Sequence, residues 1–131
     1  MGKVPAPKGP YSPWVKAGGF IYVSGQGPVD IDTGEPFLGD IARQTEMTLD
    51  NVAAVLADAG AGLGDVVKTT VFLTDINDFT RMNEVYARYF GDSKPARSTV
   101  QVAKLPTGIN LEIEAVAVDP AAGIDIVRLG D

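Results

Sequence analysis

The chain contains neither cysteine nor histidine. Their absence excludes a disulfide, a Ser-His or Cys-His nucleophile pair, and a zinc site with the usual nitrogen and sulfur ligands. A hard-cation site would need several converging carboxylates, and no Asp-rich loop of the calcium-binding type is present. We therefore expect no metal and no cofactor. Any catalysis must use Asp, Glu, Tyr, Lys, Arg and main-chain groups.

Long apolar runs are also absent, and acidic residues outnumber basic ones. No run approaches the length of a membrane span, and the amino terminus lacks the apolar segment of a signal peptide. The 17 acidic and 11 basic residues give a net charge of -6. This charge opposes a broad nucleic-acid surface, because nonspecific affinity comes mainly from clustered cations. We expect a cytoplasmic protein that has neither a membrane nor a nucleic acid as partner.

The pattern of apolar residues alternates between strand and helix periods. At 131 residues and 45% hydrophobic content, the chain fits a single domain with a real core. Gly18-Gly19 between two β-rich runs indicates a hairpin, Asp40 suits a helix N-cap, and Gly60 and Gly91 suit helix ends. The expected strands cover residues 11–17, 20–24, 66–73, 95–102 and 110–115, and the expected helices about 40–59 and 79–90.

The element order β-β-α-β-α-β-β predicts an α+β fold with a mixed sheet and both helices on one face. The other face of the sheet is then left uncovered within one chain. Because an exposed apolar sheet face favours association, we expect a homo-oligomer. The candidates to line this bare face are Val66, Phe72, Val116 and Val118.

The last two strands carry charged residues, and the Pro/Gly segment at 104–108 between them predicts a tight β-hairpin. Alternation places Arg97 and Thr99 on one face of the first strand, and Glu112 and Glu114 on a largely apolar face of the second. An acid on such a face usually lies over solvent or pairs with a cation, and an Arg often forms a surface or interface salt bridge. The pattern alone therefore leaves structural and functional roles open for Arg97 and Glu112.

Two other positions give weaker signals. Ser24 begins a segment with glycines at 25 and 27, where the backbone can turn sharply or let a ligand come close. No Gly-Lys-Ser/Thr and no helix follow, so the segment is not a phosphate loop. Asn83 lies close to the apolar stripe of the second helix, and the helix pattern alone favours an ordinary exposed amide.

Short motifs are spaced along most of the chain. They are Gly9-Pro10-Tyr11-Ser12, Ser24-Gly25-Gln26, Gln44 with Leu49-Asp50-Asn51, Asp65-Val66-Val67-Lys68, Asp78-Phe79 with Asn83 and Tyr86, Pro95-Ala96-Arg97, Leu105-Pro106, and Glu112-Ile113-Glu114-Ala115. In this order and spacing, from residue 9 to about 118, they resemble the Rid (YjgF) family. The resemblance implies a chorismate-mutase-like α+β fold and a homotrimer with ligand clefts between subunits.

The resemblance also implies an activity, the hydrolysis of reactive 2-imino acids to 2-keto acids and ammonia. These imines form from enamines such as 2-aminoacrylate or 2-aminocrotonate. The reaction suits a chain without His or Cys, because an iminium carbon is already a strong electrophile and the protein need only hold the carboxylate, place a water and move protons. By resemblance, Arg97 binds the carboxylate and Glu112 positions the water. The other matched pocket positions are Tyr11, Ser24, Asn83 and Thr99.

The chain departs from the family pattern at three pocket positions and at its end. Many such deaminases have Cys where this chain has Thr99, Gln where it has Pro13, and an aromatic residue where it has Lys94. We expect Lys94 to change the polarity of the pocket and hence the choice of substrate. The domain spans residues 1–131 and includes a short extension from about 120 to 131, whose residues 124–129 either add an edge strand or stay loose.

Other functions remain compatible with the residues. One is a regulatory module that binds keto acids or related metabolites without chemistry, since binding residues alone do not prove catalysis. Another is an endoribonuclease or translation inhibitor, which the acidic charge disfavours. The preferred imino acid and the choice between general detoxification and one pathway are also open.

Overall fold

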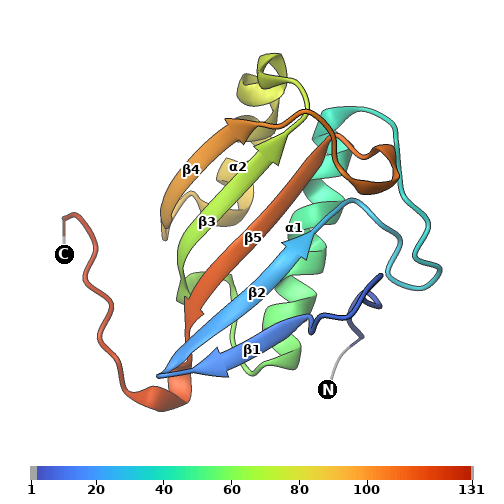
Figure 1. Cartoon of the computed structure of the whole chain (residues 1–131). Coiled ribbons are helices and arrows are strands. Elements are labelled where there is room, and N and C mark those ends of the chain that lie inside the picture. The colour runs from blue at the N-terminus through green and yellow to red at the C-terminus, as the bar shows by residue number, and fades with distance from the viewer. Residues whose placement is uncertain (1–2, 131) are drawn as a thin grey trace.

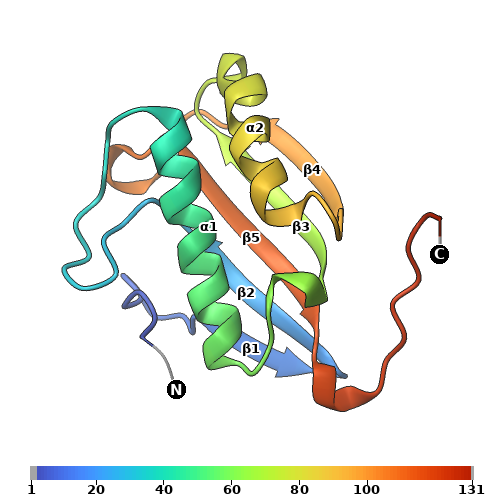
Figure 2. The same cartoon turned by 180° about the vertical axis from the view of Figure 1, so that it is seen from behind.

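The computed structural model describes residues 3–130 as a five-stranded mixed sheet with two helices on one face (Figures 1 and 2). The strand order is β1-β2-β5-β3-β4. The helices and strands are β1 Trp14–Ala17, β2 Phe20–Gln26, α1 Ile41–Asp58, β3 Val66–Leu73, α2 Phe79–Phe90, β4 Ala96–Gln101 and β5 Leu111–Val118. This architecture confirms the predicted α+β fold, and the ends of both helices and of β3 lie close to their predicted positions.

The predicted hairpin between the last two strands is wrong. The central strand β3 lies between β4 and β5, parallel to β4 and antiparallel to β5. The segment after β4 instead crosses the end of β3, where Val102 N–H donates to the Leu73 carbonyl and Thr74 N–H donates to the Asn110 carbonyl. The Pro/Gly segment therefore forms a turn within a crossover connection. The hairpin between β1 and β2 is confirmed.

The core lies between the sheet and the two helices. Asp40 caps α1 by accepting a hydrogen bond of 3.0 Å from Arg43 N–H, and Gly60, with φ 85°, follows its end. Neither helix of the described chain is long and apolar enough to span a membrane. The largest buried side chains of the core include Leu49, Val52 and Leu56 of α1, Met82 and Phe90 of α2, and Leu111 and Ile113 of β5.

Figure 1 views the sheet from the face opposite the helices, which no element of the described residues covers. Phe72 and Val116 are half-buried on this face, as predicted. The placement of Val66 there is wrong, because a register shift between Val66 and Lys68 turns its side chain into the core. The remaining candidate, Val118, is also buried within the chain. Tyr22, opposite Val116, and Val100, opposite Phe72, add exposed apolar area, with 48% and 42% of each residue exposed.

Candidate functional site

Arg97 and Glu112 lie on opposite faces of the sheet. Thr69 of β3 is paired with Arg97 on one side and with Ala115 on the other, and Thr69 and Ala115 are buried. Phe72 is paired with Glu112 and belongs to the uncovered face. Since directly opposed residues share a face, Arg97 points toward the helices and Glu112 points away from them. One chain therefore does not bring these two side chains together.

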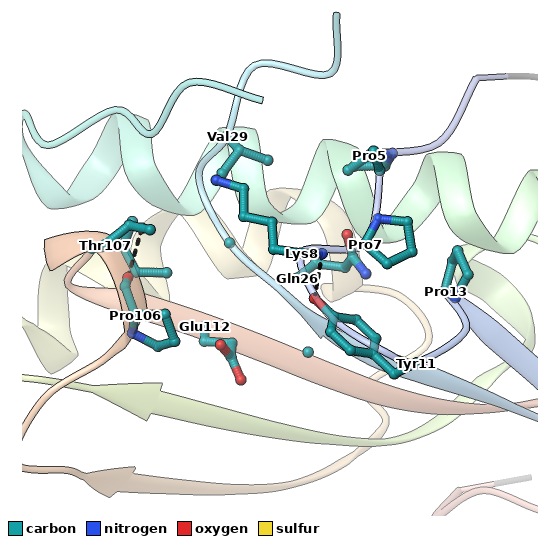
Figure 3. Close-up of a pocket in the computed structure, with 14 residues that line it drawn as sticks. Pro5, Pro7, Lys8, Tyr11, Pro13, Gln26, Val29, Pro106, Thr107 and Glu112 are labelled. Carbon is teal, nitrogen blue, oxygen red and sulfur yellow. Dashed lines mark hydrogen bonds between the residues drawn. The ribbon is translucent and has the colours of Figure 1, made fainter. Parts of the chain in front are cut away.

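Glu112 lines a hollow of about 220 Å³ between the amino-terminal arm, the end of β2 and the turn after β4 (Figure 3). Burial raises the pKa of its carboxyl, and the neighbouring Glu114 carboxylate raises this pKa further. A raised pKa makes a carboxylate a stronger base, which suits it to accept a proton and return it. The residues that line the hollow include Pro5, Pro7, Lys8, Tyr11, Pro13, Gly25, Gln26, Pro106, Thr107 and Glu112.

The glycine at position 25 makes room for the Glu112 carboxylate. A Cβ added there would collide with the carboxyl group of Glu112. Tyr11 lies across the hollow, half exposed, and its hydroxyl accepts a hydrogen bond of 3.2 Å from Lys8 N–H. Ser24 does not line the hollow; its hydroxyl donates to the Ser12 carbonyl at 2.6 Å and ties the arm to β2.

The amino-terminal arm is held against this hollow by two lysines. Lys8 donates from Nζ to the Gly34 carbonyl at 2.9 Å, and Lys3 forms an exposed ion pair with Asp32. Both contacts attach the arm to the turn at residues 30–34. In this turn the Asp30 carboxylate accepts hydrogen bonds from the main-chain N–H groups of Asp32 and Thr33, which lower its pKa.

Arg97 lines a second hollow, of about 500 Å³, between β4 and α2. Its guanidinium carbon lies 4.7 Å from the ring centroid of Tyr86 and 5.6 Å from that of Phe79. Burial raises the pKa of Tyr86, whose hydroxyl shares a 2.7 Å hydrogen bond with Thr69, so the ring stays neutral beneath the cation. The residues that line this hollow are Asn83, Tyr86, Ala87, Phe90, Gly91, Lys94, Pro95 and Arg97.

Two buried polar atoms near Arg97 have no hydrogen-bond partner. They are Oδ1 of Asn83 and Oγ1 of Thr99, the latter on the same face of β4 as Arg97. A buried polar group without a partner costs about 1–3 kcal/mol and is rare in folded proteins. The interpretation of Asn83 as an ordinary exposed amide is therefore wrong. Its side chain is half-buried and lines the Arg97 hollow.

Arg97 and Glu112 form no ion pair within residues 3–130, so neither takes part in a salt bridge inside one chain. The sequence motifs include Tyr86, but its position beneath Arg97 was not predicted. The sequence offered no signal for this stacking, because it depends on which face of β4 meets α2. Among residues 3–130, no three acidic side chains lie close enough together to hold a metal ion.

The three departures from the family pattern lie in or near the hollows. Pro13 lines the Glu112 hollow, Lys94 lines the Arg97 hollow, and Thr99 lies two residues from Arg97 on the same face of β4. The segment after β5 forms the short turn Pro120–Ala122 and no further strand. Arg128 nevertheless anchors it, since its guanidinium donates to the carbonyls of Ser93, Gly64 and Val66 at 2.7, 3.1 and 3.3 Å. The extension is therefore neither an edge strand nor loose at Arg128.

The chain from residue 1 to 119 matches the family model described as Endoribonuclease L-PSP. The chain belongs to this family, which includes the YjgF and RutC proteins. The expected family is thereby confirmed. A RutC family protein of Pyrococcus abyssi is 55% identical over 115 residues, which cover 88% of this chain and 91% of the relative.

Two solved structures of the L-PSP family share the fold. A crystal structure from Thermotoga maritima has a TM-score of 0.86 and 52% identity, covering 88% of this chain and 91% of that one. Escherichia coli TdcF, crystallised with bound serine, has a TM-score of 0.83 and 45% identity, covering 88% of this chain and 93% of its own. The name of TdcF assigns it provisionally to the reactive intermediate deaminases. The matched region ends at residue 119, so the Arg128 anchor lies beyond the family model.

Proposed function

We propose that this L-PSP family protein hydrolyses reactive 2-imino acids to 2-keto acids and ammonia, in a site completed by a second copy of the chain. The observation that carries the proposal is Arg97, which has no acidic partner within residues 3–130 and lies near the unpaired polar atoms of Asn83 and Thr99. An unpaired guanidinium in a hollow suits a ligand carboxylate. The bound serine of the TdcF structure gives further support, since serine is a small carboxylate with nitrogen on its α-carbon.

In this proposal Arg97 holds the substrate carboxylate. The guanidinium presents two N–H groups in a planar fork, and it lies over the rings of Tyr86 and Phe79, whose faces attract the cation. A charged hydrogen bond contributes about 1.5–3 kcal/mol, and two of them also orient the imine carbon. A lysine would supply the charge without the fork.

Glu112 moves the protons. Its carboxylate accepts a proton from a water as the water oxygen attacks the iminium carbon, which gives a tetrahedral intermediate bearing hydroxyl and amino groups. The protonated carboxyl then returns the proton to the nitrogen. The carbon–nitrogen bond breaks, ammonia leaves, and the hydroxyl proton passes to the released ammonia as the carbonyl of the keto acid forms. The raised pKa of Glu112 supports this role, because it brings the carboxyl closer to the working pH.

A second copy is required because Arg97 and Glu112 face opposite sides of one sheet. The uncovered sheet face, with Tyr22 and Val100 exposed, supplies an apolar surface for association. A closed homotrimer, as the family resemblance implies, would cover this face and repeat one composite site at each interface. A cytoplasmic location is part of the same proposal.

The test couples a threonine or serine dehydratase to the purified protein and follows loss of the carbon–nitrogen double-bond absorbance. Wild-type protein should shorten the lifetime of the imine, and Arg97→Ala should abolish both turnover and binding. Glu112→Gln should retain binding of the keto acid. Decay no faster than in buffer would refute the catalytic proposal.

A binding module without chemistry is the second candidate. It is favoured by the separation of Arg97 from Glu112, since a single chain offers an anion site without a nearby carboxylate. Calorimetry that shows keto-acid affinity, together with an unchanged imine lifetime, would select this function. The family description also names endoribonuclease activity. The net charge of -6 disfavours it, and cleavage of RNA that survives Arg97→Ala would indicate contamination.

A further inference from the structure

The Arg97 hollow contains a second cation, Lys94, and no acidic residue of the described chain lines it. Neither Lys94 nor Arg97 takes part in an ion pair within residues 3–130. Because acidic residues outnumber basic ones by 17 to 11, most cations have an acidic residue available to pair with, and two unpaired cations at one hollow suggest a site for an anion. A bound anion is attracted by both cations, and an anion with two charged groups can pair one group with each of them.

The backbone around Lys94 is held from both sides. Lys94 has φ 45°, in the left-handed region that side chains other than glycine rarely adopt, and its N–H donates to the Phe90 carbonyl at 2.8 Å. The carbonyl of the preceding Ser93 accepts the 2.7 Å hydrogen bond from Arg128. The position from which the Lys94 side chain leaves the backbone is therefore set by the fold rather than by a mobile loop.

The dimensions of the hollow suit a ligand longer than the smallest imino acids. Its volume of about 500 Å³ lies within the usual range for small-molecule sites. Lys94 precedes β4 and Arg97 lies at its start, with Pro95 and one further residue between them. A ligand carboxylate on Arg97 leaves the remainder of an extended chain free to reach toward Lys94.

We propose that Lys94 is a second anion-binding residue of this site, so that the protein selects 2-imino and 2-keto acids with a second carboxylate over monocarboxylate counterparts. The inference rests on the proposed function for the placement of the first carboxylate on Arg97. It adds the charge of the rest of the substrate, which the family membership leaves open.

Calorimetry with 2-oxoglutarate and 2-oxopentanoate tests the proposal, because both acids have five carbons and only the first has a terminal carboxylate. Wild-type protein should bind 2-oxoglutarate about tenfold more tightly or better, as expected for one charge-assisted contact. Lys94→Met, which keeps an unbranched stem, should reduce this ratio to about one and leave 2-oxopentanoate affinity within about twofold. Lys104→Met, in the exposed segment after β4, is the matched control and should keep the wild-type ratio.

The outcomes separate this inference from the proposed deaminase. Equal affinity for both acids, or a preference that survives Lys94→Met, overturns the role of Lys94 even if imines are hydrolysed. A Lys94-dependent preference without imine turnover supports the inference and removes the catalytic proposal. Binding of neither acid overturns both, since each requires Arg97 to hold a carboxylate. Circular dichroism of each variant checks that the fold is retained.

Discussion

Glu112 is half-buried beside a second carboxylate, and this position determines how its chemistry should depend on pH. A general base must be deprotonated, so turnover should rise with pH through the raised pKa of Glu112. Glu112→Gln should lower turnover by about 10²–10⁴-fold and remove this pH dependence, while keto-acid affinity is retained. A pH profile of imine hydrolysis measures both effects. Glu114→Gln, at an exposed position of the same strand, should keep most of the activity, and a normal rate in Glu112→Gln would disprove the assignment.

The same burial should affect stability. Because the folded-state pKa of Glu112 is raised, the folded protein binds this proton more tightly than the unfolded chain does. Its contribution to stability is therefore present at low pH and is lost as the pH rises through the folded-state pKa. Glu112→Gln should unfold at a higher urea concentration than wild type at pH 7, and the gain should disappear near pH 4. An equal gain at both pH values would show that desolvation of the charge is not the cause.

Gly25 should be essential for the position of the Glu112 carboxylate. In Gly25→Ala the new Cβ collides with the carboxyl group, which must move away from its place in the hollow. We expect a large loss of turnover with little loss of stability, because the colliding atoms are the end of a flexible side chain that can move aside. Gly64→Ala is the matched control, because a Cβ there meets no atom and the backbone needs no glycine. Turnover measured with thermal unfolding distinguishes displacement of Glu112 from general misfolding.

At the residue scale, sequence patterns identified side-chain types better than their environments. Motif spacing singled out Arg97 and Glu112, and alternation placed Arg97 and Thr99 on a shared face. Helical periodicity could not show that Asn83 is half-buried with an unpaired Oδ1, because that depends on how α2 packs over β4. It also could not show the stacking of Arg97 on Tyr86, which joins elements far apart in the sequence.

At the element scale, the helices and the central strand were predictable, whereas strand pairing was only partly so. α1 has local signals at both ends, namely the Asp40 cap and Gly60, and β3 has a long β-rich run. The β4–β5 hairpin failed because a Pro/Gly turn does not specify which strands pair. Here β3 enters between the two and receives hydrogen bonds from both. Likewise, the register shift between Val66 and Lys68 could not be predicted, because the apolar run that contains it looks regular in the sequence.

The segment after β5 should stabilise the α2–β4 connection through Arg128. Its contacts to three carbonyls join this segment to the start of β3 and to Ser93. Arg128→Ala should cost about 1–3 kcal/mol and increase hydrogen exchange in residues 91–95. Arg81→Ala is the control, because Arg81 is exposed and forms an ion pair with Glu84 in its own helix. Exchange mass spectrometry makes the comparison, and unchanged protection in Arg128→Ala would show that the anchor is incidental.

At the scale of the whole molecule, the separation of Arg97 and Glu112 leads to a prediction for mixed assemblies. Each composite site would take Arg97 from one copy and Glu112 from its neighbour. Arg97→Ala and Glu112→Gln should each be inactive alone, because every site lacks one group. In an equal mixture assembled at random, one neighbouring pair in four combines an intact Arg97 with an intact Glu112. Joint refolding should therefore restore about a quarter of wild-type turnover in a closed ring.

Joint refolding of the two variants from urea, followed by the coupled imine assay and light scattering, measures this recovery. Each variant refolded alone is the negative control, and wild type carried through the same steps sets the full scale. Restored turnover requires both that copies associate and that the two faces of the sheet meet across the interface. A mixture that assembles normally but stays inactive would place Arg97 and Glu112 in unrelated roles. The Arg97 hollow on the helix side of β4 would then act as a binding site without the Glu112 carboxylate.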